Sequence, residues 1–303
     1  MRIILVGQGP FGEKVLEALF RKGEEVVGVF SPPDKRGEAV KELAERSKIS
    51  FFRPARMKDP EVHHVLSNLR PDLVILAFVT DILPENLLPI PSIGTICYHP
   101  SLLPRHRGAS GINWAIMWGD TRTGMTIFWA DKGIDTGPVL LQKAVEIGPD
   151  DTAGSLYFNT LFPMGIEAMA EAVELINKGK APRIPQDESK ATYEPPCDDR
   201  VSSVDFEKSI HDVYNLIRGC DPQPGAHTTF EGKKVRFHDA RMIPSPSGNK
   251  PGEIAAIEEG GLHITVKGGI VKVGRLRVDK GEKMGPMEFA RLVGLKAGDR
   301  FGI

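Results

Sequence analysis

The chain contains 303 residues, in which 39 Lys and Arg nearly balance 40 Asp and Glu, so its formal net charge is −1. This balance provides no global field that attracts nucleic acid or an anionic membrane, and a nucleic-acid partner would require a local basic patch. The first residues lack the basic and long apolar segments of a signal peptide, and no apolar run approaches the roughly 20 residues that span a bilayer. We therefore expect a cytoplasmic protein with no membrane partner.

The first part of the chain alternates short apolar runs with helical patterns. Strand patterns occupy residues 2–6, 25–30, 73–78, 94–98 and 125–128, and helical patterns occupy residues 11–22, 39–47 and 167–177. Alternation at this length is typical of an α/β fold with a parallel, doubly wound sheet. Ligands of such sheets bind at the carboxyl ends of the strands.

The sequence changes character after this region. Residues 180–196 contain four prolines and many polar side chains, which is typical of an extended linker. Beyond it, a helical segment at 206–218 precedes β-rich runs at 235–237, 254–257, 262–266 and 270–273, which predict a small barrel-like domain. We expect a first domain at residues 1–180, a linker at 181–203 and a second domain at 204–303.

Three cysteines, Cys97, Cys197 and Cys220, lie far apart and form no Cys-x-x-Cys pair. This spacing argues against a disulfide framework and against a zinc site. We therefore expect no bound metal, and a reducing compartment fits best.

The run GQGPFG at residues 7–12 matches the glycine fingerprint of dinucleotide-binding folds and lies between a predicted strand and a predicted helix. That fingerprint also requires an acidic residue at the end of the second strand. The second strand instead ends at Phe30 and runs into Pro32 and Pro33, with Asp34 only after them. We therefore expect a tight turn and close helix packing rather than NAD binding, and an NAD-dependent oxidoreductase stays an alternative.

The run HPSLLPRHRG at residues 99–108 follows the predicted strand at 94–98. It places a histidine, a serine and several basic side chains where a doubly wound sheet delivers its ligand. A lone histidine is more often a structural, hydrogen-bonded residue, but this polar neighbourhood favours a functional role for His99.

The run WADKGIDTG at residues 129–137 follows the predicted strand at 125–128 and carries two carboxylates. Asp131 is typical of a solvated turn residue. Asp135, enclosed by Ile134, Thr136 and Gly137, is the better candidate for a functional carboxylate.

Together, HPSLLPRHRG and GIDTG at residues 133–137, whose aspartate follows the histidine by 36 positions, resemble the signature of the 10-formyltetrahydrofolate-dependent formyltransferases. That family includes methionyl-tRNA formyltransferase, sugar-amine formyltransferases and the hydrolase domain of 10-formyltetrahydrofolate dehydrogenase, and this chain resembles the last branch more closely. The resemblance implies a Rossmann-like formyltransferase domain followed by a smaller OB-like domain. It also implies 10-formyltetrahydrofolate as formyl donor in one-carbon metabolism, with no NAD and no metal.

The resemblance further implies which residues form the site. His99 and Asp135 would be the catalytic pair, because formyl transfer needs a donor for the developing oxyanion and a base for the nucleophile. His106 is expected at the rim of the site. The loop at residues 78–84 and the turn at 101–104 are expected to contact folate through Asp81, Ile82, Leu83, Ser101, Leu102, Leu103 and Pro104.

One position departs from the family pattern. Many members have an asparagine two residues before the catalytic histidine, where this chain has Cys97, and a thiol is a poor hydrogen-bond donor. We expect Cys97 to be a buried, inert packing residue, with a catalytic or redox thiol as the alternative.

The acceptor of the formyl group stays open between water, as in a hydrolase, a small amine and initiator tRNA. The loop at residues 31–38 is short and only mildly basic, whereas the tRNA enzymes resemble one another in a longer basic insertion there. Water or an amine is therefore favoured, and methionyl-tRNA formyltransferase proper is the alternative. A non-catalytic folate-binding module is a further alternative, although both His99 and Asp135 are retained.

Overall fold

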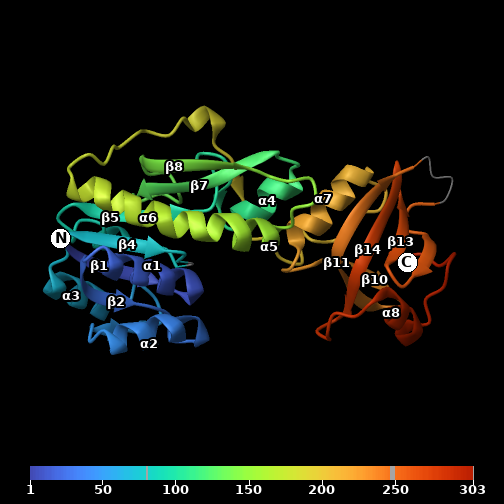
Figure 1. Cartoon of the computed structure of the whole chain (residues 1–303), viewed down its shortest axis with the longest axis horizontal. Helices are drawn as coiled ribbons and strands as arrows, with labels where there is room; N and C mark the ends of the chain where they lie inside the picture. The colour runs from blue at the N-terminus through green and yellow to red at the C-terminus, as the bar shows by residue number, and fades with distance from the viewer. Residues whose placement is uncertain (80, 246–249, 303) are drawn as a thin grey trace. The chain divides into compact units, whose positions relative to one another are not determined.

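The computed structural model describes residues 1–79, 81–245 and 250–302 (Figure 1). The chain forms two compact units, each assembled from separate stretches. The first unit comprises Met1–Gly108, Gly124–Val145 and Asn159–Tyr193, and the second comprises Ala109–Thr123, Glu146–Phe158 and Glu194–Ile303. The expected domains at 1–180 and 204–303, with a linker at 181–203, are each continuous in sequence, whereas each observed unit combines three separate stretches. The expected boundaries stay a prediction.

The first unit is built on a seven-stranded sheet with the strand order β3-β2-β1-β4-β5-β7-β8. The neighbouring pairs from β3 to β5 are parallel, and β7 pairs with β5 in the antiparallel sense. The strands are β1 (Arg2–Gly7), β2 (Glu25–Phe30), β3 (Phe51–Phe52), β4 (Leu73–Ala77), β5 (Gly94–His99), β7 (Arg122–Trp129) and β8 (Val139–Glu146).

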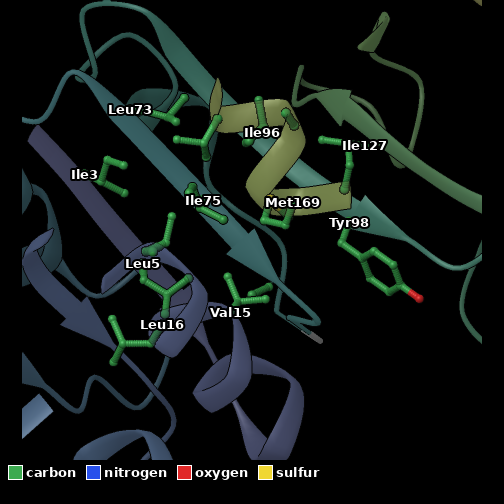
Figure 2. Packing of buried hydrophobic residues seen from close by; sticks show 14 of the residues in the cluster. Ile3, Leu5, Val15, Leu16, Leu73, Ile75, Ile96, Tyr98, Ile127 and Met169 are labelled. Atoms are coloured by element: carbon green, nitrogen blue, oxygen red, sulfur yellow. The ribbon is translucent and has the colours of Figure 1, made fainter. Parts of the chain in front are cut away.

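Successive side chains of a strand point to opposite faces of a sheet. Because the strands of this sheet carry apolar side chains on both faces, helices cover both. In β1, Ile3 and Leu5 belong to one buried cluster and Ile4 belongs to another. The first cluster includes apolar residues of α1 (Gly9–Arg21), α2 (Glu38–Arg46) and α6 (Phe162–Asn177), as Figure 2 shows for part of it. The second includes residues of α3 (Pro60–Leu69).

Close packing at the turn between β1 and α1 accounts for its glycines. A Cβ added to Gly12 would lie 2.9 Å from the backbone carbon of Gly7, so a larger residue cannot be accommodated there without a backbone shift. Gly9 adopts a left-handed conformation with φ +59°, which glycine tolerates best. These contacts support the expected tight turn.

The second unit contains a five-stranded antiparallel sheet with the order β10-β11-β14-β13-β12. A two-residue turn joins the first pair, in which Glu231 and Gly232 both have positive φ, as a tight hairpin requires. The strands are β10 (Ala226–Phe230), β11 (Lys233–Pro244), β12 (Ile254–Glu258), β13 (Gly261–Val266) and β14 (Gly269–Val278). The helices are α4 (Gly111–Met117), α5 (Ala153–Leu156), α7 (Ile210–Cys220) and α8 (Pro286–Val293).

Shorter elements complete the description. They are the 3-10 helices η1 (Lys35–Gly37), η2 (Glu85–Leu87) and η4 (Glu188–Lys190), the π-helical turn η3 (Tyr157–Leu161), and the paired strands β6 (Arg107–Gly108) and β9 (Tyr193–Glu194). Among the described residues, no helix is long and apolar enough to cross a membrane.

The predicted fold class is confirmed: a sheet dominated by parallel strands is joined to a separate antiparallel β unit. The predicted strand at residues 25–30 coincides with β2, and the other predicted strands of the first unit lie within a few residues of their observed bounds. The sequence patterns did not predict α3, α4, β8, β10 or α8.

Candidate active site

His99 is the last residue of β5 and lies at the carboxyl end of that strand, in the candidate site. Buried apolar residues precede it in the strand and fix its direction, among them Ile96 and Tyr98. The His99 side chain is itself buried, with only 5% of the residue exposed. A polar ring in such a position must find hydrogen-bond partners.

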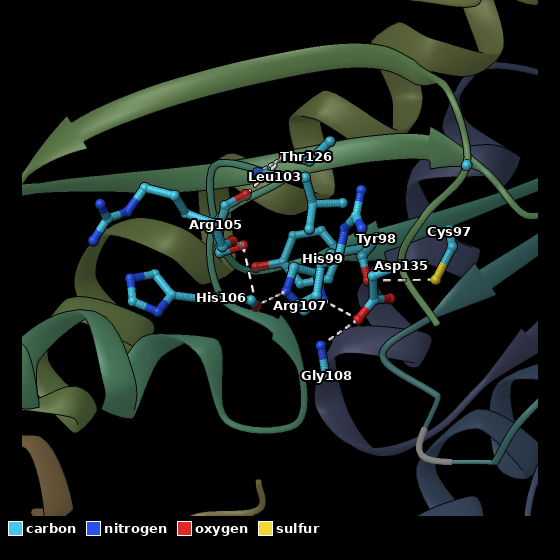
Figure 3. A network of polar contacts seen from close by, with 12 residues as sticks. Cys97, Tyr98, His99, Leu103, Arg105, His106, Arg107, Gly108, Thr126 and Asp135 are labelled. Atoms are coloured by element: carbon cyan, nitrogen blue, oxygen red, sulfur yellow. Dashed lines mark hydrogen bonds and ion pairs between the residues drawn. The ribbon is translucent and has the colours of Figure 1, made fainter. Parts of the chain in front are cut away.

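His99 has a partner on each ring nitrogen (Figure 3). Nε2 lies 2.7 Å from the carbonyl oxygen of His106, and Nδ1 lies 3.4 Å from Oδ2 of Asp135. The backbone N–H of Gly108 donates to the same Oδ2 at 2.7 Å. The histidine and the aspartate singled out from the sequence are therefore neighbours, although 36 positions separate them.

The contact with His106 fixes the role of one ring nitrogen. A carbonyl oxygen only accepts, so the 2.7 Å contact requires a hydrogen on Nε2 of His99. Nδ1 is then the ring nitrogen that faces the Asp135 carboxylate.

A strained loop carries Asp135. The residue has φ +56°, a left-handed conformation that is uncommon for residues other than glycine and costs about 1–3 kcal/mol. Nearby, the ideal Cβ position of Gly137 lies only 1.7 Å from the carbonyl oxygen of Trp129. Glycine is therefore required where this loop passes over the end of β7.

The turn predicted at residues 101–104 follows His99 in the chain and is tightly folded. Ser101 is fully buried, and its hydroxyl donates to the carbonyl oxygen of Arg105 at 2.6 Å. The backbone N–H of Leu103 donates to Oγ1 of Thr126 at 3.1 Å, and a cis peptide bond joins Leu103 to Pro104. Leu102 is only half-buried. The turn is thus anchored on β7.

The second predicted folate-binding segment lies beyond β4. Asp81 accepts hydrogen bonds from the backbone N–H groups of Met57 and Ile82, at 2.7 and 3.0 Å. Asp81 also lines a cavity of about 240 Å³, together with residues at the ends of β1 and β2. Ile82 is largely exposed and Leu83 is half-buried. Thr80, which belongs to the predicted loop, lies outside the described residues.

His106 does not lie at the rim, so that expectation is wrong. Only 2% of the residue is exposed, and its backbone N–H donates to Oγ1 of Thr192 at 2.8 Å. Its carbonyl group, rather than its ring, contacts His99. The polar residues of HPSLLPRHRG did not indicate that the His106 side chain is buried.

Three contributions to the site were missed by sequence reasoning. The side chain of Gln186 donates to the carbonyl oxygens of Asp135 and Gly137, Arg107 donates to Gln186, and the N–H of Gly108 binds the Asp135 carboxylate. The sequence pattern assigned Gln186 to a proline-rich stretch that is typical of a linker. A backbone N–H leaves no signature in the sequence.

Cys97 is half-buried rather than fully buried as predicted, but its environment supports the inert interpretation. Burial raises the pKa of the Cys97 thiol, and the nearby charge of Asp135 adds to this effect. Its Sγ contacts the carbonyl oxygen of Tyr98 at 3.6 Å. In contrast, a hydrogen bond from the Cys220 thiol lowers the pKa of Cys197, with the two sulfur atoms 3.7 Å apart.

We therefore expect Cys97 to react much more slowly than Cys197 with an alkylating reagent, because the thiolate is the nucleophile. A difference of one pKa unit alone changes the thiolate fraction about tenfold. Iodoacetamide labelling of the native protein at neutral pH, followed by peptide mass spectrometry, measures both rates. Labelling of Cys97 at the rate of Cys197 would contradict the inert interpretation.

A sheet dominated by parallel strands thus carries a buried histidine–aspartate pair at the end of β5. A family model for formyl transferases matches residues 1–173, and a model for the formyl transferase C-terminal domain matches residues 198–293. The chain belongs to the formyl transferase family, which confirms the resemblance inferred from the two motifs.

Relatives from two branches are similar to the chain. The mitochondrial 10-formyltetrahydrofolate dehydrogenase of Homo sapiens is 42% identical over 283 residues, covering 90% of this chain but only 30% of the relative. The methionyl-tRNA formyltransferase of Acetivibrio thermocellus is 37% identical over 308 residues, covering 99% of this chain and 98% of the relative. The chain thus spans about a third of the length of the dehydrogenases that it matches.

The fold also resembles solved structures. HypX of Aquifex aeolicus in complex with tetrahydrofolic acid superposes with a TM-score of 0.68 at 25% identity, covering 97% of this chain and 47% of that one. The phosphoribosylglycinamide formyltransferase of Anaplasma phagocytophilum superposes with a TM-score of 0.54 at 26% identity, covering 64% of this chain and 99% of that one.

Proposed function

We propose that this chain transfers the formyl group of 10-formyltetrahydrofolate to an acceptor and releases tetrahydrofolate. The observation that carries the proposal is the buried contact between His99 and Asp135 at the end of β5, in a chain that belongs to the formyl transferase family. A non-catalytic folate-binding module would not need to retain this contact. A nicotinamide-dependent oxidoreductase is disfavoured because β2 ends at Phe30 without the acidic residue that the dinucleotide fingerprint requires.

In the proposed reaction, an oxygen or nitrogen atom of the acceptor attacks the formyl carbon, and the bond between that carbon and N10 of the folate breaks. His99 stabilises the negative oxygen of the tetrahedral state by donating a hydrogen bond, for which its Nε2–H turns from the His106 carbonyl oxygen to the substrate. Asp135 receives the proton that the acceptor loses, and the His99–Asp135 pair returns a proton to N10. With water the products are formate and tetrahydrofolate, and with an amine they are a formamide and tetrahydrofolate.

The folate would bind between the two predicted segments. Ile82 and Leu83 offer apolar surface, and the turn at Ser101, Leu102, Leu103 and Pro104 leads directly from the catalytic histidine. A flat ring with a polar edge requires such a combination of apolar walls and backbone groups. Asp81 contributes by holding the first segment through the N–H groups of Met57 and Ile82.

We expect 5-formyltetrahydrofolate, a stable analogue, to slow hydrogen exchange in residues 81–84 and 101–105 more than elsewhere, because bound ligand blocks local opening of these segments. Mass spectrometry of the free and ligand-bound protein measures the effect. Peptides from β11 and β14 serve as internal controls. Protection confined to other surfaces would contradict this assignment.

Water or a small amine is the proposed acceptor, because the loop at residues 31–38 is short and carries few basic side chains. Initiator tRNA is a second candidate, favoured by the similarity to a methionyl-tRNA formyltransferase over nearly the full length of both chains. Tetrahydrofolate release is measured with no added amine, with methionyl initiator tRNA and with nucleotide-linked amino sugars. Turnover that requires charged tRNA would reject the hydrolase and small-amine alternatives.

A further inference from the structure

Residues 182–192 follow the surface of the first unit and are fixed to it at several points. The indole N–H of Trp129 donates to the carbonyl oxygen of Pro182 at 2.8 Å. Val139 and Ile184 exchange two backbone hydrogen bonds of 2.8 and 3.0 Å. The guanidinium of Arg183 lies 3.7 Å from the centre of the Trp129 ring, where a cation–π contact is favourable. This segment therefore has a defined path past the loop that carries Asp135.

Gln186, in the middle of this segment, contacts the backbone on both sides of Thr136. Its Nε2 donates to the carbonyl oxygen of Asp135 at 2.8 Å and to that of Gly137 at 2.7 Å. Its Oε1 accepts from Nη2 and Nε of Arg107, at 2.8 and 3.2 Å. Both amide hydrogens and both lone pairs are thus used, so the orientation of the amide is fixed.

Arg107 holds the other end of this contact in place. Its side chain is fully buried, and a buried cation is tolerated only when it is paired and hydrogen-bonded. Nη1 and Nη2 donate to the two carboxylate oxygens of Glu188 at 2.8 and 2.7 Å, and Nη1 also donates to the hydroxyl of Tyr193 at 2.8 Å. With the two bonds to Gln186, all five N–H groups of the guanidinium have an acceptor.

The same network reaches the Asp135 carboxylate by a second route. Gly108 directly follows Arg107 in the chain, and its N–H donates to Oδ2 of Asp135. Gln186 therefore connects the backbone of Asp135 to the segment that binds its carboxylate. Asp135 has the less favourable φ of +56°, and contacts to both its backbone and its carboxylate help to maintain this conformation.

We propose that Gln186 is a positioning residue for the reaction: it holds Asp135 in the orientation in which its carboxylate meets His99. This inference rests on the proposed function, because it assigns Gln186 a role only if Asp135 acts in catalysis. Gln186 does not touch the reacting atoms. A displacement of about 1 Å at a catalytic group can lower a rate about 100-fold, so loss of the two hydrogen bonds is expected to affect turnover.

Gln186→Met removes the amide at nearly constant volume and should lower kcat about 10-fold to 100-fold, with a change of less than about 3-fold in the KM for 10-formyltetrahydrofolate. Gln186→Glu keeps the acceptor for Arg107 but replaces the NH₂ donor, and it should also lower kcat. The matched control is Lys190→Met, in the same segment, at a side chain that is 71% exposed. Its kcat should equal that of the unmodified protein.

Measuring Gln186→Met in the Asp135→Asn variant distinguishes a positioning role of Gln186 from a general effect on protein stability. If Gln186 acts through Asp135, then Gln186→Met should change the residual kcat of Asp135→Asn by less than about 2-fold, because residues acting as one unit are not additive. An equal loss in both backgrounds, or an unchanged kcat in Gln186→Glu, would overturn the positioning role. Should Gln186→Met fail to fold, Gln186→Glu alone decides. Wild-type turnover in Asp135→Asn would instead reject the catalytic role of Asp135, on which this inference rests. No tetrahydrofolate release by the unmodified protein with any acceptor would reject the proposed function itself.

Discussion

His99→Ala and Asp135→Asn should each lower kcat by about 100-fold or more, while the Kd for a folate analogue changes little. Positioned acid–base and oxyanion groups contribute factors of this size. His99 at the end of β5 and Asp135 in the loop after β7 both lie outside the segments proposed to bind folate. Steady-state kinetics with 10-formyltetrahydrofolate, together with analogue titration, separates the two effects.

The double variant extends this test. Because Nδ1 of His99 faces Oδ2 of Asp135 at 3.4 Å, the two residues should act as one proton-transfer unit. Turnover of the double variant should then be hardly lower than that of the worse single variant. Losses that multiply, or near-normal turnover in Asp135→Asn, would contradict the proposed role of the pair.

Gly137→Ala should displace the loop that carries Asp135. The added Cβ would lie 1.7 Å from the carbonyl oxygen of Trp129, which belongs to β7 and cannot move independently. We expect a loss of about 1–3 kcal/mol in the free energy of unfolding, as for other overpacked sites. Turnover should fall about 100-fold, because the loop also carries Asp135. Urea unfolding and kinetics measure the two quantities.

A glycine in open surroundings provides the control for this substitution. Gly260 has only the flexible end of Lys272 within 4 Å of its ideal Cβ position, at 3.4 Å from Nζ. Gly260→Ala should therefore change the free energy of unfolding by less than about 0.5 kcal/mol, as surface substitutions usually do. An equally small effect of Gly137→Ala would show that the loop can relax.

Sequence patterns were sufficient for the elements with strong periodicity. The buried strands β2, β4 and β5 read as apolar runs because helices cover both faces of the sheet. Strand β8 was missed because it alternates half-buried and exposed residues at the end of the sheet, without an apolar run. Helix α6 begins at Phe162, earlier than its pattern suggested, because Pro163 lies in the first turn, where proline is tolerated.

The sequence predicted those candidate site residues that lie in recognisable motifs. His99 and Asp135 were found because each follows a predicted strand in an unusual polar run. Gln186 and Arg107 could not be assigned in this way, because their roles depend on contacts across 79 positions of sequence. The burial of His106 likewise follows from tertiary packing and from its bond with Thr192, which no local pattern encodes.

The most direct measurement of the central claim follows tetrahydrofolate release from 10-formyltetrahydrofolate by the purified chain, without added cofactor, beside Asp135→Asn at the same concentration. We predict multiple turnovers by the unmodified protein, with formate or a formylated amine formed in equal amount to tetrahydrofolate, and a rate about 100-fold lower in Asp135→Asn. Binding of 10-formyltetrahydrofolate with no release of tetrahydrofolate under any acceptor condition would contradict the account.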